Sequence, residues 1–238
     1  MATQDKTPLG SVCTIIVGVD EAPPPPMNFG LPGSLEFRGF EVDLLNAVGQ
    51  RLGLEVRFKS ALWDQLLTEL ATDKLDLICS AATVTEDRAR EFDFSDPYLD
   101  MELVLVQRSG DKTDTDLQLA TIGVRRATIA ESYQRTHWPE SPVRRFDFNT
   151  DTYRALQTGE IDLVIDDSPI GMHFAAALIG IEVFRSFPDT AAQYALLLRK
   201  GNTTLLREVN TALRQLRSGG TWDMLNRHWF PHGSKLKE

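Results

Sequence analysis

A pattern of nine residues occurs twice in this chain of 238 residues. Residues 70–78 read Leu-Ala-Thr-Asp-Lys-Leu-Asp-Leu-Ile, and residues 156–164 read Leu-Gln-Thr-Gly-Glu-Ile-Asp-Leu-Val. Each copy indicates the end of a helix, a polar turn and a strand that opens with aspartate. A chain that repeats this transition is expected to build the same kind of unit twice, so the sequence predicts two α/β lobes.

The surrounding segments repeat in the same way. Residues 13–20 predict a buried strand, and residues 120–125 predict a second one with the same Ile/Val-Gly-Val core. Apolar side chains at helical spacing predict amphipathic helices over residues 40–52 and 63–70. We assign these apolar faces to core packing, except for Trp63, which lies in a first helical turn where it can face a cleft.

Two strand-like runs, residues 101–108 and 193–199, are placed to connect the lobes. The chain is expected to leave the first lobe near residue 103, build the second and return near residue 193. Residues 202–217 and 221–229 then predict two closing helices, the first capped by Asn202 or Thr203.

The predicted boundaries follow directly. Lobe 1 comprises residues 12–103 plus 193–238, lobe 2 comprises residues 104–192, and residues 1–11 form a flexible N-terminal extension.

Composition excludes several classes of function. With 42% hydrophobic and 25% charged residues the chain is typical of soluble globular proteins, and its net charge of −9 with scattered Lys and Arg argues against nucleic acid and acidic membranes as partners. No apolar run approaches the roughly 20 residues of a membrane helix. The polar start, residues 1–8, has no signal-peptide core, so a leader was either removed or never present, and we expect the former.

One arginine lies at a predicted helix start. Thr85 can cap a helix that opens with Glu86 and Asp87, directly after the buried strand near residues 75–78. Arg88 then lies near the carboxyl end of that strand, where ligands bind in open α/β sheets, and its guanidinium can clamp a carboxylate. The alternative is a surface ion pair with Glu86 or Glu91.

The stretch from Thr83 to Arg88, followed by Phe92 to Tyr98, resembles a signature of the family 3 extracellular solute-binding proteins, the amino-acid receptors of bacterial uptake systems. The resemblance implies a periplasmic-binding-protein-like fold: two Rossmann-like lobes, joined by two hinge strands, that close on a ligand. It also implies a monomeric periplasmic or extracellular protein that delivers an amino acid to the membrane permease of an ABC transporter. Arg88 would bind the ligand's α-carboxylate.

The resemblance assigns further ligand contacts in the first lobe. The Ala81 carbonyl and the Thr83 hydroxyl occupy positions that complete the amine and carboxylate contacts. The family's stacking aromatic near the first strand's end is missing, so we expect Trp63 to supply the apolar face, with Met27 or Phe29 nearby.

In the second lobe, Thr128 and Glu131 form a capping-box pattern after the predicted strand. Members of the family have Gly-Thr-Thr at this turn, which donates backbone N–H groups to the ligand carboxylate; here the turn reads Ala127-Thr128-Ile129. Backbone donation by Thr128 and Ile129 survives these differences, whereas the second hydroxyl is lost. The alternative is an ordinary helix cap.

An aspartate follows the repeated strand of the second lobe. In similar proteins an acid five residues after the strand's opening aspartate, here Asp162, pairs with the ligand's ammonium group, which points to Asp167. Asp166 is expected to face the other way by strand alternation. The alternative is that either residue only caps the helix after Pro169.

Charged residues give conflicting indications of the ligand's side chain. Arg125 ends the second-lobe strand at a position that touches the ligand's side chain in similar proteins, while Asp20 and Glu21 approach from the opposite wall. An acidic ligand would pair with Arg125 and a basic one with an acid, unless Arg125 and Glu21 neutralise each other across the cleft. The internal pair favours a polar, uncharged or amide-bearing amino acid.

Motifs for catalysis, cofactors and metals are absent from the sequence: there is no G-x-S-x-G, no phosphate-binding glycine loop and no H-E-x-x-H, and the four histidines are dispersed. We therefore predict no enzyme, cofactor or metal. Two alternatives share the fold, namely the ligand-sensing domain of a membrane receptor and a cyclohexadienyl-dehydratase-like enzyme in which Glu21 or Asp167 would act as general acid.

Overall fold

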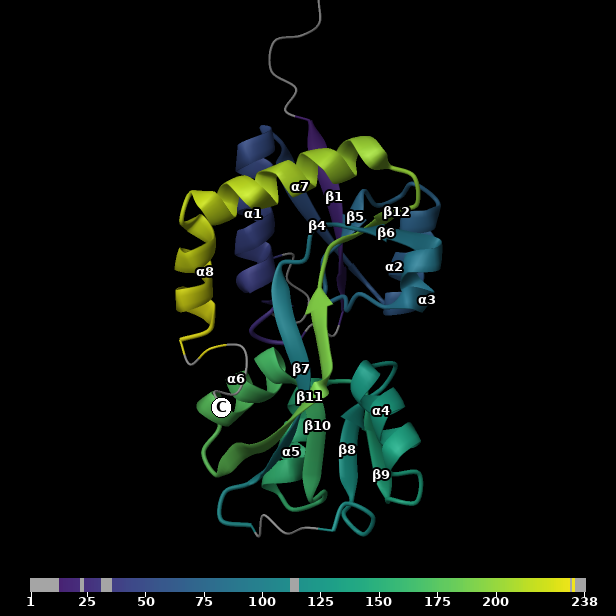
Figure 1. Cartoon of the computed structure of the whole chain (residues 1–238), viewed down its shortest axis with the longest axis vertical. Coiled ribbons are helices and arrows are strands. Elements are labelled where there is room, and N and C mark those ends of the chain that lie inside the picture. Colours follow the sequence, from purple (N-terminus) through teal and green to yellow (C-terminus); the bar gives the residue numbers. More distant parts are fainter. Residues whose placement is uncertain (1–12, 22–23, 31–35, 112–115, 232, 234–238) are drawn as a thin grey trace, which may run out of the picture.

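The computed structural model describes residues 13–21, 24–30, 36–111, 116–231 and 233. The predicted N-terminal extension, residues 1–11, lies outside the described residues. The described chain forms two lobes, each around its own five-stranded sheet (Figure 1). The predicted bilobal α/β fold is confirmed.

The two sheets have related strand orders. The first runs β4 (Glu55–Ala61), β1 (Thr14–Asp20), β5 (Leu77–Ile78), β12 (Leu197–Arg199) and β6 (Phe92–Phe94). The second runs β11 (Ile181–Tyr194), β7 (Leu99–Arg108), β10 (Leu163–Asp167), β8 (Ile122–Arg125) and β9 (Val143–Phe146). A short ladder, β2 (Phe29–Gly30) with β3 (Phe37–Arg38), precedes the first helix.

The helices agree closely with the predicted segments. The first lobe carries α1 (Phe40–Leu52), α2 (Trp63–Ala71), α3 (Glu86–Glu91), α7 (Thr203–Ser218) and α8 (Thr221–Trp229). The second carries α4 (Ile129–His137), α5 (Asn149–Gln157) and α6 (Ser168–Ala177). Of the two proposed caps for α7, Asn202 accepts the hydrogen bond, from the Leu205 N–H at 3.4 Å.

The sequence repeat is also a structural repeat. In the first lobe β5 pairs in parallel with β1, with Leu77 opposite Val17. In the second lobe β10 pairs in parallel with β8, with Leu163 opposite Ile122. Leu77 and Leu163 are equivalent positions of the repeated pattern, so both lobes use the same register.

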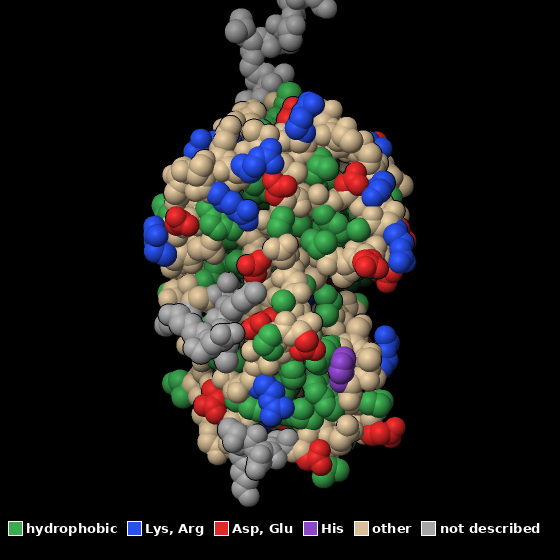
Figure 2. Space-filling model, in the orientation of Figure 1, with side chains coloured by type: hydrophobic (Ala, Val, Ile, Leu, Met, Phe, Trp, Pro, Cys, Tyr) green, Lys and Arg blue, Asp and Glu red, His purple; other side chains and the backbone are tan. Residues whose placement is uncertain are grey.

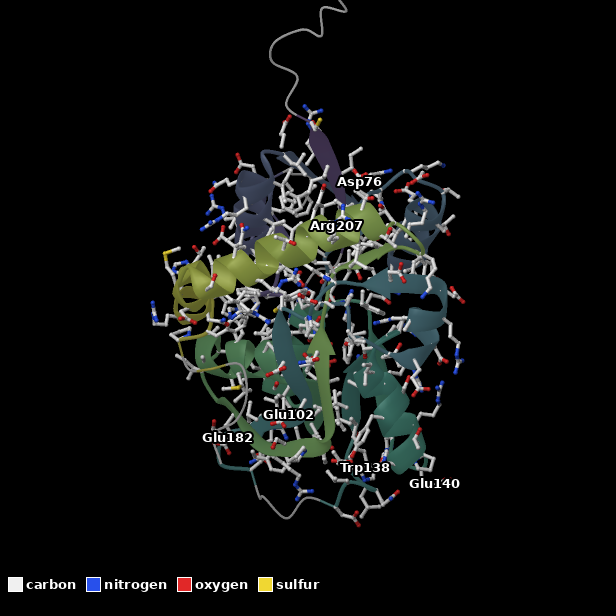
Figure 3. The ribbon with its side chains drawn as sticks, turned by 45° about the horizontal axis from the view of Figure 1, so that its top comes forward. Asp76, Glu102, Trp138, Glu140, Glu182 and Arg207 are labelled. Carbon is white, nitrogen blue, oxygen red and sulfur yellow. The ribbon has the colours of Figure 1, made fainter. Side chains whose placement is uncertain are left out.

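An aspartate in each copy of the pattern and a glycine in the strand that pairs with it explain why the arrangement recurs. The opening aspartates, Asp76 and Asp162, each accept a hydrogen bond from the neighbouring strand, from the Ile16 N–H at 2.7 Å and the Thr121 N–H at 2.8 Å. Figure 3 labels Asp76 near β1. A side chain at either strand glycine has no room: a Cβ at Gly18 would lie 2.7 Å from Leu75, and one at Gly123 would lie 2.3 Å from Ile161.

Strands β7 and β11 connect the lobes in the middle of the molecule (Figure 1). The predicted strand over residues 193–199 is interrupted, because β11 ends at Tyr194 and β12 begins at Leu197. Between them the Ala195 N–H donates to the Ala82 carbonyl at 3.1 Å and the Leu196 N–H to Ser95 Oγ at 3.0 Å. The chain therefore leaves one sheet and enters the other here.

Candidate functional site

A cavity of about 410 Å³ lies between the lobes. The molecule narrows there on the side where α3 and α4 face each other (Figure 2). All ten residues singled out from the sequence line this cavity: Asp20, Glu21, Trp63, Ala81, Thr83, Arg88, Arg125, Thr128, Ile129 and Asp167. Its size is within the roughly 300–1,000 Å³ of small-molecule sites.

Arg88 is held at the cavity by its own lobe. Thr85 caps α3 by accepting from the Arg88 N–H at 3.3 Å, as predicted. The guanidinium donates to the Thr83 carbonyl at 3.1 Å and lies over the Trp63 ring, 4.9 Å from its centroid. Burial lowers the pKa of Arg88, and the Asp167 charge opposes that effect, so the side chain remains a cation.

The alternative reading of Arg88 as a surface ion pair is wrong. The arginine that pairs with Glu86 is Arg90, at 4.0 Å, and Arg90 also pairs with Asp87 at 2.8 Å. Both of these pairs are exposed, whereas Arg88 is partly buried at the cavity.

Asp167 comes from the opposite lobe, at the carboxyl end of β10. It occupies the N-cap position of α6, but its side chain makes no capping hydrogen bond and accepts from the Tyr194 hydroxyl instead. Burial raises the pKa of Asp167 to about 6, although the Tyr194 hydrogen bond and the charges of Arg88 and Arg125 oppose the rise. The two arginines are therefore both within electrostatic reach of this carboxyl group.

Asp166 also lines the cavity, so the expectation that it turns away from it is wrong. Alternation does give it different partners: Asn149 donates to it at 2.8 Å and Tyr153 at 3.1 Å, both from α5. Burial and the neighbouring Asp167 charge raise the pKa of Asp166 to about 7. Two adjacent carboxyl groups thus titrate as a pair near neutral pH.

This pair predicts that the ligand-free protein loses stability as the pH rises. A folded-state pKa above the unfolded value means that the folded protein binds more protons, so the free energy of unfolding falls between about pH 4 and pH 7. Asp166→Asn removes one of the two groups, so the free energy of unfolding of this variant should fall by roughly 1–4 kcal/mol less than that of the wild type as the pH rises. Urea denaturation at pH 5 and pH 8 measures the difference; an unchanged pH dependence in the variant would contradict the assignment.

The N-terminus of α4 faces the cavity from the second lobe. Thr128 is its cap, accepting from the Glu131 N–H at 3.3 Å, and its hydroxyl also donates to the Arg125 carbonyl at 2.7 Å. Since the hydroxyl is used within the turn, Thr128 and Ile129 offer the cavity their backbone N–H groups. Ala127 has φ = 58°, the left-handed region that favours glycine, which accounts for the glycine of the related turn.

A second left-handed alanine lies across the cavity. Ala81 has φ = 47°, and its N–H donates to the carboxylate of Glu41 at 2.6 Å. Thr83, two residues on, is buried and pairs with Tyr194 in an isolated antiparallel bridge. The first-lobe loop is therefore fixed by buried hydrogen bonds on the side away from the cavity.

An ion pair crosses the cavity between the lobes. Arg125 Nη2 lies 2.9 Å from Asp20 Oδ2, with both side chains largely buried. The sequence predicted that Arg125 is neutralised from the opposite wall but assigned the wrong acid, since Glu21, beyond the end of β1, is exposed. Asp20 is the last residue of β1, which places its carboxylate at the cavity, within reach of Arg125.

The apolar wall differs in part from the expectation. Trp63 lines the cavity, but Met27 is fully buried in the core and Phe29 packs edge-on against Trp229. Sequence reasoning missed several lining residues, which carry no motif and reach the cavity from loops and helix starts: Leu62, Ser80, Arg126, Asp147, Phe148, Asn149 and Ile170.

Other kinds of site find no support in the described part of the chain. Among these residues there is no group of three or more His, Cys, Asp or Glu side chains arranged to hold a metal ion. None of the described helices is long and apolar enough to cross a membrane.

Comparison with known proteins gives a consistent result. The model of a family described as bacterial extracellular solute-binding proteins, family 3, matches residues 15–232. The L-cystine-binding protein TcyJ of Escherichia coli is 29% identical over 230 residues, covering 91% of this chain and 82% of that protein. The glutamine-binding protein GlnH of Bacillus subtilis is 28% identical, covering 85% and 77%.

Solved structures show the same fold. A mutant of ArgBP from T. maritima, a protein whose structure with bound arginine is also among the matches, has a TM-score of 0.82 and 32% identity, covering 92% of this chain and 96% of that one. An ancestral amino acid-binding protein, described as a precursor of cyclohexadienyl dehydratase, has a TM-score of 0.82 and 30% identity, covering 91% and 95%.

Proposed function

Because this chain belongs to the family 3 bacterial extracellular solute-binding proteins, we propose that its solute is an L-amino acid, bound in the cavity between the lobes. The family membership confirms the sequence-based identification. The named relatives bind cystine, glutamine and arginine, which supports an amino acid as the solute here.

Arg88 and the N-terminus of α4 would bind the α-carboxylate. A guanidinium offers two parallel N–H donors to a carboxylate, and a helix N-terminus adds free backbone donors and a favourable dipole. Arg88 comes from the first lobe and Thr128 with Ile129 from the second, so one carboxylate would contact both lobes. The Thr83 hydroxyl would complete this set.

Asp167 and the Ala81 carbonyl would bind the ammonium group. A deprotonated Asp167 supplies the counter-charge, and a backbone carbonyl supplies a neutral acceptor. The observation that carries the proposal is that Arg88 and Asp167, from opposite lobes, line one cavity and interact electrostatically. A zwitterion that enters between Arg88 and Asp167 finds an opposite charge for its carboxylate and for its ammonium group.

Hinged closure follows from this division of contacts. A ligand that touches both lobes favours the state in which they are close together, and β7 and β11 are the strands that would absorb the movement. We further propose that the loaded, monomeric protein delivers its ligand outside the cytoplasm to the permease of an ABC transporter, and that the lobes divide at residues 103 and 193.

The ligand's side chain is expected to carry no net charge. Because Asp20 and Arg125 pair with each other, the cavity wall they form needs no charge from the ligand, and Trp63 with Leu62 and Phe148 selects by shape. Thermal-shift screening of the twenty amino acids and cystine should give the largest stabilisation with a polar or amide-bearing amino acid.

Two results of this screen would overturn the choice of side chain. Strongest stabilisation by glutamate or aspartate would show that Arg125 pairs with the ligand's side chain. Strongest stabilisation by lysine or arginine would show that Asp20 or Glu21 does so. No stabilisation by any amino acid would contradict the proposed function itself.

An enzymatic role is tested by the same protein preparation. Asp167 has a raised pKa in a cleft, as a general acid requires, and one structural relative is described as the precursor of a dehydratase. We propose binding without catalysis, so prephenate and arogenate should remain unconverted after overnight incubation. Turnover of either would assign the chain to the enzyme class.

A further inference from the structure

Two fully buried tyrosines, Tyr98 and Tyr194, lie where the chain crosses between the lobes. Tyr98 directly precedes β7, and Tyr194 ends β11. The Tyr98 N–H donates to the Tyr194 carbonyl at 2.8 Å, and their ring centroids are 6.3 Å apart at an angle of 46°. Neither side chain lines the cavity, so neither is placed to touch a ligand.

The hydroxyl of Tyr194 reaches one of the two proposed ammonium acceptors. It donates to Oδ2 of Asp167. Tyr194 ends β11, a strand of the same sheet as Asp167, and its backbone also pairs with Thr83 of the first lobe in a β-bridge. This hydrogen bond therefore sets the orientation of the carboxylate from a strand that also contacts the first lobe, and it leaves Oδ1 for another donor.

The hydroxyl of Tyr98 reaches the other acceptor through one intermediate. It donates to Oε1 of Glu41, and the same oxygen accepts from the Ala81 N–H at 2.6 Å. Because Ala81 has the uncommon left-handed conformation, this hydrogen bond to its N–H helps to hold the turn that also carries its carbonyl. Asn28 Nδ2 holds the second oxygen of Glu41 at 2.5 Å.

We propose that Tyr98 and Tyr194 are positioning residues for the ligand's ammonium group: Tyr194 orients the Asp167 carboxylate directly, and Tyr98 orients the Ala81 carbonyl through Glu41. This rests on the proposed function for its ligand, but the hydrogen-bond geometry stands without one. Both acceptors of the ammonium group are thereby fixed at the hinge, so the site is pre-organised where the lobes rotate.

The charged surroundings of Asp167 make the role of Tyr194 measurable. Arg88 from α3 and Arg125 from β8 both act on this carboxyl group, Asp166 adjoins it in β10, and Glu41 faces Tyr194 from α1. The Tyr194 hydroxyl stabilises the ionised form of Asp167, so its loss must raise the pKa of Asp167. A merely structural hydroxyl would leave that pKa unchanged.

The first test needs no ligand. Carboxyl-carbon NMR titration of the ligand-free protein, with the Asp167 signal assigned by Asp167→Asn, should show a higher midpoint in Tyr194→Phe than in the wild type. Tyr153→Phe is the matched control, because it removes a buried hydroxyl that donates to the adjacent Asp166. It should move the Asp166 midpoint more than that of Asp167, which follows only through the coupling of the two carboxyl groups, whereas Tyr194→Phe should move the Asp167 midpoint more.

The second test uses the amino acid that stabilises best in the thermal-shift panel, or L-glutamine and L-cystine where none does. At pH 7.5 Tyr194→Phe and Tyr98→Phe should each weaken its binding by about 2- to 10-fold, the effect of one lost hydrogen bond. For Tyr194→Phe the loss of affinity relative to the wild type should grow as the pH falls to 6, because the higher pKa of Asp167 in this variant leaves more of it protonated. Tyr153→Phe should bind within twofold of the wild type at both pH values.

The outcomes separate the two proposals. A raised Asp167 midpoint in Tyr194→Phe, with no binding by any wild-type or variant protein, would support the hold of Tyr194 on the Asp167 carboxylate but contradict both the amino-acid function and the ammonium as the group being positioned. Normal binding by both phenylalanine variants, with an unshifted Asp167 midpoint, would overturn the positioning role and leave the function intact.

Discussion

Replacing Arg88 with alanine is expected to cost the protein roughly 2–5 kcal/mol of ligand binding, about thirtyfold to several thousandfold in affinity. The loss is large because the ligand's α-carboxylate would stay in the cavity without its cationic partner, while Trp63 and the Thr83 carbonyl would lose the guanidinium they hold. Calorimetric titration with the amino acid found by screening measures it. The free energy of unfolding of the ligand-free protein should barely change.

Arg90→Ala is the matched control for this variant. Arg90 lies two residues further along α3, and its ion pairs with Asp87 and Glu86 are exposed, so its removal should change affinity by less than about 0.5 kcal/mol. If Arg88→Ala binds as tightly as Arg90→Ala, the carboxylate lies elsewhere in the cavity.

The fold was predictable because its constraints are local and repeated. A glycine in each first strand, an aspartate opening each repeated strand and a matching apolar run appear in the sequence at equivalent positions, and the two ladders use them in the same register. Strand ends were less predictable. The chain passes from β11 to β12 through hydrogen bonds made by Ala195 and Leu196, and no local pattern signals that change of sheet.

The site was predictable where a residue ends a repeated element. Arg125 and Asp167 are the last residues of β8 and β10, Thr128 caps the helix after β8, and Arg88 lies in the short helix that follows β5; all four line the cavity. It was harder to predict which of two adjacent acidic residues contacts Arg125. Asp20 rather than Glu21 pairs with Arg125, because strand direction and burial decide which acid points inward, and a sequence shows neither directly.

The support beneath the site was not predictable. Glu41 is an acid in the first turn of α1, yet it is 1% exposed and accepts hydrogen bonds from Asn28, Ala81 and Tyr98. These partners come from separate parts of the chain. Only the folded arrangement reveals that one carboxylate holds three loops.

Glu41→Ala is therefore expected to destabilise the ligand-free protein by about 3–5 kcal/mol. It leaves the Asn28 amide, the Ala81 N–H and the Tyr98 hydroxyl as buried donors without their acceptor, and each unsatisfied group costs about 1–3 kcal/mol. Removing the carboxyl group offsets part of this cost, because burial raises the pKa of Glu41 and so disfavours its charged form. Urea denaturation at pH 7 measures the difference.

Glu41→Gln separates lost hydrogen bonds from lost charge. The glutamine oxygen can accept from Ala81 and Tyr98, but its amide would then meet the Asn28 amide, donor against donor. Asn28 resolves the conflict by turning its own amide over, since its Oδ1 is buried and has no hydrogen-bond partner among the described residues. The cost should therefore be about 1–3 kcal/mol, that of the one Asn28 amide group that loses the Cys79 carbonyl and is left buried without an acceptor. Equal destabilisation by glutamine and alanine would show that the charge of Glu41, rather than its accepted hydrogen bonds, holds the three loops together.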